Sequence, residues 1–434
     1  MNAFKIYCSA LADAFLAGDS DLNALKSRGQ RCLGSTPAWL ENLCQGIIQH
    51  NLLHDTDTLT DYICHYEPLR NAWFADTLPR RIAYYFFPTP QPTQPAPFVD
   101  QSIIRLATFN DLCEFFQLDE NHLLWLSDPW GSTREHSQGP LQHYVYRWVD
   151  KKNSESSRLL EIPKARLKTI QRKIHQELLS KIPAHPDSHG FVKGCSIVSY
   201  TSAHLDKQWI LRLDLEHFFP SISYPRIFTI FSSLGYRKPI ARHLSLLCTN
   251  RVPRKILGNK ITDWRFRKTM MAPHLPQGAP TSPALANLAA FNLDCRLSAL
   301  AKHIDSSYSR YADDMLFSGN SYRNLNSLIP YIGHILAEEG FHMNYRKTRV
   351  MGAGQRQIAT GIVLNKHHNL PRQEYDRLKA ILHNCVCKGV ESQNKGHPNF
   401  YAFLKGKLNY LSMLNPSKAK KLEAMFLQID WSSQ

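Results

Sequence analysis

The spacing of apolar and polar positions changes along the chain, from helical periodicity near its start to short buried runs in its middle. In residues 1–87 apolar side chains recur three and four positions apart, as in the stretch 39–48, and this spacing predicts helices. Residues 209–220 form an apolar run that indicates a buried strand ending in Asp214, followed by two aromatic residues. Residues 309–319 predict a strand, a two-residue turn and a second strand. The pattern therefore indicates a mixed α+β protein.

Carboxylates lie where these strands are expected to end. Asp313 and Asp314 fall at the turn, and Asp214 comes at the end of the other strand. Crowded carboxylates repel one another unless they take up protons or are neutralised by cations. Two Mg²⁺ ions about 3.5–4 Å apart are the usual solution in phosphoryl-transfer enzymes, so we expect two Mg²⁺ ions here, with Mn²⁺ able to substitute. The alternative is a buried acidic strand end that is paired with Lys or Arg.

An irregular loop rich in proline and glycine precedes a helix within residues 275–288. Ser282 is a good N-terminal cap and Pro283 suits the first helical position, so the helix is expected to begin there. The loop itself contains Gln277 and Gly278. Small residues in such a loop would let a flat base pair lie close to the backbone.

In the order Asp214, Gln277-Gly278 and Tyr311-Ala312-Asp313-Asp314, the chain resembles reverse transcriptases. It is most similar to the bacterial retron-type and defence-associated members of that family. The resemblance extends from about residue 146 to about residue 431, roughly two thirds of the chain. It also includes His189-Gly190-Phe191-Val192-Lys193-Gly194 with Ser196-Ile197, Gly340-Phe341 with Asn344 and Lys347, and residues 360–365.

This resemblance implies an RNA-directed DNA polymerase with a right-hand polymerase fold. The expected parts are a palm, in which an antiparallel sheet packs on helices, together with fingers, a helical thumb and a helical N-terminal extension. The expected boundaries are 1–97 for the extension, 98–205 for the fingers, 206–350 for the palm and 351–434 for the thumb. Within the extension, residues 88–97 contain five prolines, which favour an extended linker.

The same resemblance assigns roles to individual residues. Asp214, Asp313 and Asp314 would be catalytic, and together with Leu215 they would hold the metal ions. Phe219 would lie under the sugar and exclude a 2′-hydroxyl, with Phe218 as the alternative. The other expected nucleotide-binding residues are Lys151, Lys152, Arg158, Gln277, Gly278 and Lys347. The expected nucleic-acid contacts are Lys168, Arg172, Lys193, Tyr311, Gly361, Lys405, Lys407 and Lys418.

The roles expected for residues of the fingers also rest on the local pattern of the sequence. Two strands are expected around the polar turn 153–157, which would direct Arg158 and either Lys151 or Lys152 at the incoming triphosphate. The basic residues of 164–173 recur at helical intervals and predict a template-contacting stripe. The alternative for this stripe is a solvated helix face.

Two departures from the retron pattern affect the expected role. Retron enzymes usually carry Asn-Ala-x-x-His where this chain has Tyr200-Thr201-Ser202-Ala203-His204, and their Val-Thr-Gly appears here as Ala359-Thr360-Gly361. We therefore expect a stand-alone defence-associated (anti-phage) enzyme that uses dNTPs to copy a structured non-coding RNA template into a cDNA product. The alternatives are a retron enzyme making a branched RNA–DNA hybrid and a group II intron derivative. A non-enzymatic alternative is an RNA-binding scaffold.

Charge and composition agree with a polyanionic partner. The formal net charge is +16, and residues 341–434 hold 15 Lys and Arg against 5 Asp and Glu, whereas residues 1–100 hold 7 against 10. The ten cysteines include no Cys-x-x-Cys pair, which favours reduced thiols over a zinc site or a disulfide framework. The sequence has neither the pattern of a signal peptide nor an apolar run of membrane-spanning length, so we expect a cytoplasmic protein with no membrane partner.

Overall fold

The structure, a computed structural model, describes residues 3–17, 21–50, 52–53, 56–79, 81–84, 86, 104–106, 108–131, 139, 142–150, 157–321 and 325–431. The expected linker 88–97 and the candidate residues Lys151 and Lys152 lie outside this part of the chain. The chain divides into two compact units, the first made of residues 1–183 and 223–281, the second of residues 184–222 and 282–434. These units differ from the four expected segments, whose boundaries stay a prediction.

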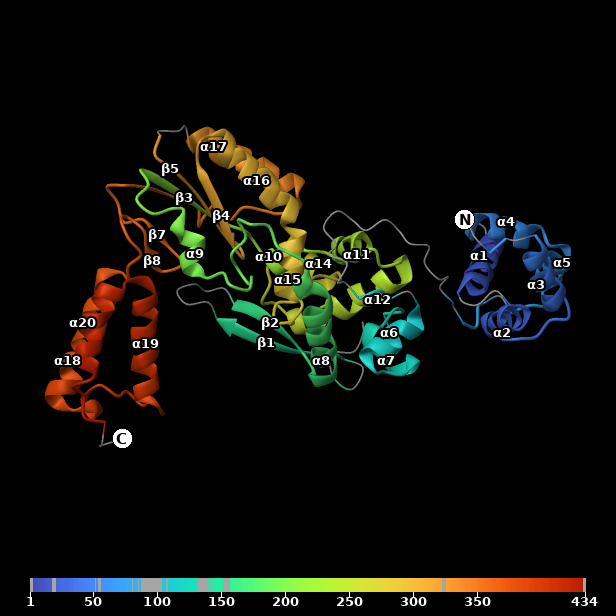
Figure 1. The fold of residues 1–434 in the computed structure, drawn as a ribbon, viewed down its shortest axis with the longest axis horizontal. Coiled ribbons are helices and arrows are strands. Elements are labelled where there is room, and N and C mark those ends of the chain that lie inside the picture. The colour runs from blue at the N-terminus through green and yellow to red at the C-terminus, as the bar shows by residue number, and fades with distance from the viewer. Residues whose placement is uncertain are drawn as a thin grey trace. The chain divides into compact units, whose positions relative to one another are not determined.

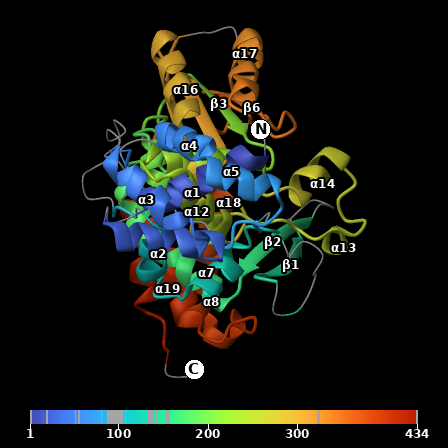
Figure 2. The same cartoon turned by 90° about the vertical axis from the view of Figure 1, so that its right-hand side faces the viewer.

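The helices expected near the start of the chain are confirmed. Leu11, Phe15, Leu25 and Leu43 are among the residues that form an apolar core inside these helices, all almost fully buried. These helices, drawn in blue, lie together in Figures 1 and 2. They are α1 (Ala3–Leu16), α2 (Leu22–Leu33), α3 (Leu40–Gln49), α4 (Thr56–His65) and α5 (Glu67–Phe74).

The rest of the first unit surrounds an antiparallel hairpin. Strands β1 (Tyr144–Asp150) and β2 (Ser157–Pro163) pair in full register, as the sequence predicted, and α8 (Ala165–Lys173) follows directly. Leu159 packs with Val252 and Met270 in a small core beneath the hairpin. The other helices of this unit are α6 (Phe109–Phe116), α7 (Glu120–Ser127), α11 (Tyr224–Ser233), α12 (Lys238–Cys248), α13 (Arg254–Leu257) and α14 (Trp264–Met271), and a π-helical turn (Ile174–Leu178) and a 3₁₀ turn (Leu179–Lys181) extend α8.

A four-stranded antiparallel sheet organises the second unit. Its strand order is β4 (Ser307–Tyr311), β5 (Asp314–Gly319), β3 (Trp209–Asp214) and β6 (Arg349–Gly352). Helices α16 (Phe291–His303) and α17 (Leu325–Glu338) run side by side along the sheet in Figure 1. Helices α9 (Ile197–Ser202), α10 (Phe218–Ser221) and α15 (Ser282–Ala289) complete this part, and α15 begins where the sequence predicted.

The C-terminal part of the second unit is helical, as expected. A short hairpin of β7 (Ile358–Ala359) and β8 (Ile362–Val363) precedes α18 (Arg372–Lys388), the 3₁₀ turn Val390–Ser392, α19 (Phe400–Leu414) and α20 (Pro416–Phe426). The Asn415 side chain accepts a hydrogen bond from the Lys418 backbone N–H and so caps α20, directly after α19 ends. Among the residues described, no helix combines the length and the apolar character needed to span a membrane.

The strand expected to end at Asp214 is confirmed. β3 ends at that residue, and Phe218 begins the short helix α10. The reason lies at His217, whose backbone is left-handed, with φ of 49°. A non-glycine residue in that conformation reverses the chain direction, which ends any extended continuation of the strand.

Candidate active site

Asp214 and Asp314 are direct partners in the antiparallel pairing of β3 with β5. Side chains that face each other across an antiparallel pair lie on one face of the sheet, so the pairing sets these two carboxylates side by side. The expected two-residue turn between β4 and β5 is Ala312 and Asp313, and Ala312 has a left-handed φ of 56°. The Leu215 backbone N–H donates to the Asp313 carbonyl at 2.8 Å, which fixes the turn against the end of β3.

Cations of the protein pair with Asp214 and Asp314. The Lys347 ammonium lies 2.9 and 3.0 Å from the Asp214 carboxylate oxygens, while the Arg212 guanidinium donates to both oxygens of Asp314 at 2.7–3.1 Å. Burial raises the pKa of Asp314 above its usual range and Arg212 lowers it, while the charges of Asp313 and Asp214 raise it further. The three carboxylates therefore interact electrostatically, and the pairing with Lys and Arg that the sequence left as an alternative is present in this structure.

The expected three-carboxylate metal cluster is not assembled in this arrangement. Among the residues described, no three acidic, histidine or cysteine side chains are grouped closely enough to hold a metal ion. The ion pairs give the physical reason, because Lys347 and Arg212 draw two of the carboxylates toward themselves. The donor set nevertheless suits Mg²⁺, which prefers oxygen ligands. The Lys347 side chain is 57% exposed, so its ammonium can leave Asp214 for solvent or an anion without a large burial cost.

Aromatic rings border the carboxylates. Phe218 is 4% exposed and packs against Phe341, with ring centroids 5.7 Å apart, whereas Phe219 is only partly buried. The ring of Phe191 lies 6.2 Å from that of Phe219 and 6.3 Å from that of Tyr311. Of the two candidates for the residue under the sugar, Phe219 thus has the more accessible ring.

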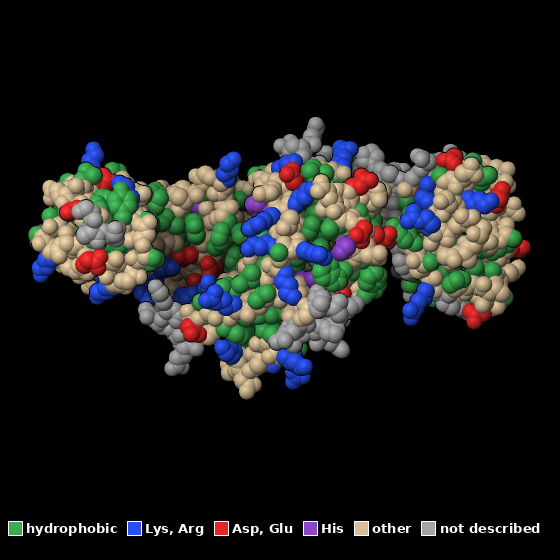
Figure 3. Space-filling model, turned by 90° about the horizontal axis from the view of Figure 1, so that it is seen from below, with side chains coloured by type: hydrophobic (Ala, Val, Ile, Leu, Met, Phe, Trp, Pro, Cys, Tyr) green, Lys and Arg blue, Asp and Glu red, His purple; other side chains and the backbone are tan. Residues whose placement is uncertain are grey.

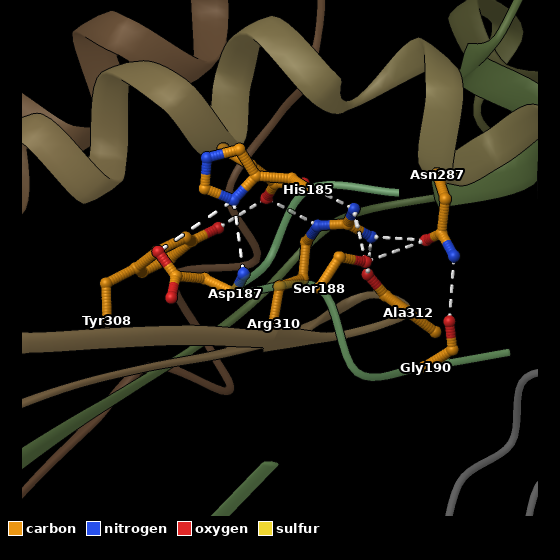
Figure 4. A network of polar contacts seen from close by, with 9 residues as sticks. His185, Asp187, Ser188, Gly190, Asn287, Tyr308, Arg310 and Ala312 are labelled. Atoms are coloured by element: carbon orange, nitrogen blue, oxygen red, sulfur yellow. Dashed lines mark hydrogen bonds and ion pairs between the residues drawn. The ribbon is translucent and has the colours of Figure 1, made fainter. Parts of the chain in front are cut away.

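A buried polar network holds the hairpin of β4 and β5 (Figure 4). Arg310, on β4, is fully buried, and its guanidinium donates to Asp294 on α16 at 2.7 and 2.6 Å. The same guanidinium reaches the Asn287 side chain and the Ala312 carbonyl at 3.1 Å each, and the Ser188 hydroxyl at 3.0 Å. The sequence analysis missed this support. The available signal was a lone arginine in the strand Ser307–Tyr311, three residues before Asp313.

The loop of Gln277 and Gly278, which are expected to bind nucleotide, lies against a second buried pair, Glu161 and His274. Gly278 has φ of 134°, and a Cβ there would meet the Glu161 carbonyl oxygen at 2.9 Å. The Glu161 backbone N–H donates to the Gln277 carbonyl at 2.9 Å, so β2 holds this loop directly. The Glu161 carboxylate lies 3.0 Å from His274 Nε2 and accepts from Asn250 at 2.6 Å. Arg158 is exposed on the same strand.

Both ring nitrogens of His274 face oxygen acceptors. Nδ1 lies 2.8 Å from the Ala272 carbonyl, and Nε2 faces Glu161. Only the protonated ring can donate from both nitrogens. Burial alone lowers the pKa of His274, but the Glu161 charge and the hydrogen bonds to Glu161 and Ala272 raise it above the ordinary value. The geometry and the direction of this shift both favour the protonated ring beside Glu161.

The expected nucleic-acid contacts lie on both units and stay predictions. Arg172, Lys193, Gly361 and Lys407 are exposed, and Lys168, Tyr311, Lys405 and Lys418 are partly buried. Lys405, Lys407 and Lys418 each lie over an aromatic ring, those of Phe426, Phe403 and Tyr375. On the face in Figure 3, Lys and Arg side chains are spread over the surface rather than gathered in one patch.

Comparison with known proteins identifies the class. The family described as reverse transcriptase (RNA-dependent DNA polymerase) matches residues 149–363. The retron Mx65 reverse transcriptase of Myxococcus xanthus is 39% identical over 284 residues, covering 65% of this chain and 64% of the relative. The retron Mx162 reverse transcriptase of the same organism is 32% identical over 308 residues, covering 66% and 61%. The retron Ec86 reverse transcriptase of Escherichia coli is 32% identical over 241 residues, covering 55% and 69%.

The chain belongs to the reverse transcriptase family. It spans less than two thirds of the length of the two Myxococcus relatives. The matched residues 149–363 include the hairpin with Asp313 and Asp314, the strand with Asp214 and the loop with Gln277 and Gly278.

Proposed function

We propose that the protein is an RNA-directed DNA polymerase of the retron type, which copies a structured non-coding RNA into cDNA from dNTPs. The observation that carries the proposal is the register pairing of Asp214 with Asp314 beside the Asp313 turn, within the matched region. Carboxylates at paired strand ends suit the binding of divalent cations, and such cations would neutralise negative charge in phosphoryl transfer.

The residues of the second unit have distinct roles in this proposal. Asp214, Asp313 and Asp314 would hold the divalent cations, together with the main-chain carbonyl of Leu215, since a leucine side chain has no donor atom. Bound there, two Mg²⁺ ions would favour deprotonation of the primer 3′-hydroxyl and neutralise the pyrophosphate leaving group.

Lys347 is suited to exchange one anion for another. Its ammonium neutralises Asp214 in the free protein, and its side chain is more than half exposed. When nucleotide is bound, the same ammonium would be free to contact the triphosphate as a point charge. Asn344, whose amide donates to Asp214 at 3.3 Å, would keep the carboxylate oriented after Lys347 has moved.

The relatives bear on the choice among reverse-transcriptase classes. The three relatives named above are retron reverse transcriptases. Their similarity favours the retron alternative over a stand-alone enzyme, despite the altered motifs around His204 and Gly361. We therefore include in the proposal a branched RNA–DNA product and a role in anti-phage defence.

A scaffold that only binds RNA is the competing proposal. It gives no reason for three carboxylates at the ends of paired strands, which repel one another unless cations neutralise them. It also gives no reason to anchor the turn that carries Asp313 through a fully buried Arg310–Asp294 pair.

Sequencing the nucleic acid that copurifies with the full-length protein tests this proposal. We expect one structured non-coding RNA together with DNA complementary to part of it, and we expect that DNA to stay joined to RNA under denaturing conditions. Unlinked cDNA from one RNA would favour the stand-alone class. A mixture of cellular RNAs without any complementary DNA would support the scaffold and contradict the proposal.

A further inference from the structure

Phe191 presents an aromatic ring to solvent beside the catalytic hairpin. Its side chain is 51% exposed, and its backbone is left-handed, with φ of 62°. The nearest rings are those of Phe219 and Tyr311, with centroids 6.2 and 6.3 Å away. A single exposed aromatic residue is ordinary on a protein surface. This one differs because of where it lies and how firmly the loop that carries it is held.

The loop before Phe191 is fixed to the hairpin and to α15. The His189 backbone N–H donates to the Arg310 carbonyl at 2.8 Å, and the Gly190 carbonyl accepts from the Asn287 amide at 2.8 Å (Figure 4). A Cβ at Gly190 would lie 2.5 Å from the Ala312 backbone nitrogen, so only glycine allows this approach. The position of Phe191 is therefore tied to the turn that carries the catalytic aspartates.

Such an arrangement is costly unless the exposed ring has a use. A phenylalanine in the left-handed region is disfavoured, and outliers of this kind concentrate at functional sites. The ring is tilted against its two neighbours, while half of its surface stays in water. Lys193, two residues further on, is exposed as well. An apolar π-face next to a cation suits a nucleic acid, whose bases stack and whose phosphates are negative.

We infer that Phe191 is a stacking surface for a nucleobase at the end of the primer–template duplex bound at the hairpin. This inference rests on the proposed function, since it requires that primer–template binds beside Asp313. Base–aromatic stacking is worth about 5- to 150-fold in affinity per base. Because stacking releases no counterions, it contributes to affinity without changing the salt dependence of binding.

Fluorescence of 2-aminopurine tests the inference in the absence of dNTP and therefore without catalysis. The full-length protein is titrated into primer–template duplexes that carry 2-aminopurine at successive positions around the primer end. Stacking on Phe191 predicts that one position responds to the wild-type protein and that this response is lost in Phe191→Ala. The dissociation constant of that variant should rise by about 5- to 150-fold. The slope of its logarithm against the logarithm of salt concentration should not change.

Three further variants separate stacking from other effects. Phe191→Tyr keeps the π-face and should restore both the signal and the affinity, whereas Phe191→Leu keeps apolar bulk without a π-face and should not. Tyr331→Ala removes a ring that is 55% exposed on α17 and should leave binding unchanged. If Phe191→Ala binds like wild type, or if Phe191→Leu restores binding fully, the inference is wrong. If the wild-type protein binds no primer–template at all, the proposed function itself fails.

Discussion

Arg310 and Asp294 form an ion pair whose side chains are both completely buried, with the shortest N–O distance at 2.6 Å. The pair joins β4, which leads into the aspartate-bearing turn, to helix α16. The hydroxyl of Tyr308 also donates to Asp294, at 2.8 Å. The turn that carries Asp313 is therefore anchored to helix α16 by a desolvated charge pair.

Asp294→Ala should destabilise the protein strongly, because it leaves the Arg310 charge buried without its partner. Removing one member of a buried pair typically costs about 3–5 kcal/mol. The free energy of unfolding from urea titration measures this effect. Glu338→Ala provides the control, since Glu338 pairs with Arg296 of the same helix α16 at the exposed surface. The control should change stability little, and an equally mild effect of Asp294→Ala would contradict the anchoring role.

The Glu161–His274 pair makes a pH-dependent contribution to stability. Because the pKa of His274 is raised in the folded protein, its contribution is fully present below the ordinary pKa of about 6.5. It is lost as pH rises through the folded-state pKa. We expect the unfolding free energy of the wild type to fall on that alkaline side. His274→Gln is the control. Glutamine does not titrate, so the unfolding free energy of this variant should change less with pH over the same alkaline range.

The same substitution should affect nucleotide use. His274 and Glu161 hold the loop of Gln277 and Gly278 against β2, so loosening the pair should raise the KM for dNTP more than it lowers the affinity for primer–template. Steady-state kinetics and duplex binding at one pH separate the two quantities. Equal losses in both would indicate general unfolding rather than loop positioning.

Phe219→Ala should relax the discrimination between deoxyribonucleotides and ribonucleotides. The Phe219 ring is partly accessible, whereas Phe218 is buried against Phe341, so only Phe219 is placed to meet a bound sugar. The ratio of kcat/KM for dCTP to that for CTP measures discrimination. Phe218→Ala is the matched variant and should destabilise the protein without changing this ratio. The opposite outcome would make Phe218 the selecting residue.

Neutralising Lys405, Lys407 and Lys418 together should weaken template–primer binding and flatten its salt dependence. Each lost phosphate contact reduces the logarithmic slope by about 0.7–0.9. Binding titrations between low and moderate salt measure the slope. The exposed cations Lys5 and Arg70, which lie in the acidic N-terminal segment, provide the control pair. An unchanged slope in the triple variant would mean that the three lysines make no contact with phosphate.

The local pattern of residues was sufficient to predict some features of the fold and of the site, but it was insufficient for others. The turn at Asp313 and the strand ending at Asp214 follow from short-range alternation and from residue type. The ion pairs could not be foreseen, because Lys347 is 133 positions from Asp214 and His274 is 113 positions from Glu161. The left-handed backbone at His217 and the short helix α10 after it could not be predicted from residue type alone.

Incorporation of dNTP by Asp313→Ala, measured beside RNA binding by the same preparation, tests the catalytic assignment of the hairpin most directly. We expect incorporation below about one thousandth of the wild-type rate, because a ligand of the metal ions that stabilise charge in the transition state is lost, while RNA affinity stays close to wild type. Glu216→Ala, which removes an exposed carboxylate two residues beyond Asp214, should retain activity. A polymerising Asp313→Ala enzyme would contradict the assignment of this hairpin as the catalytic centre.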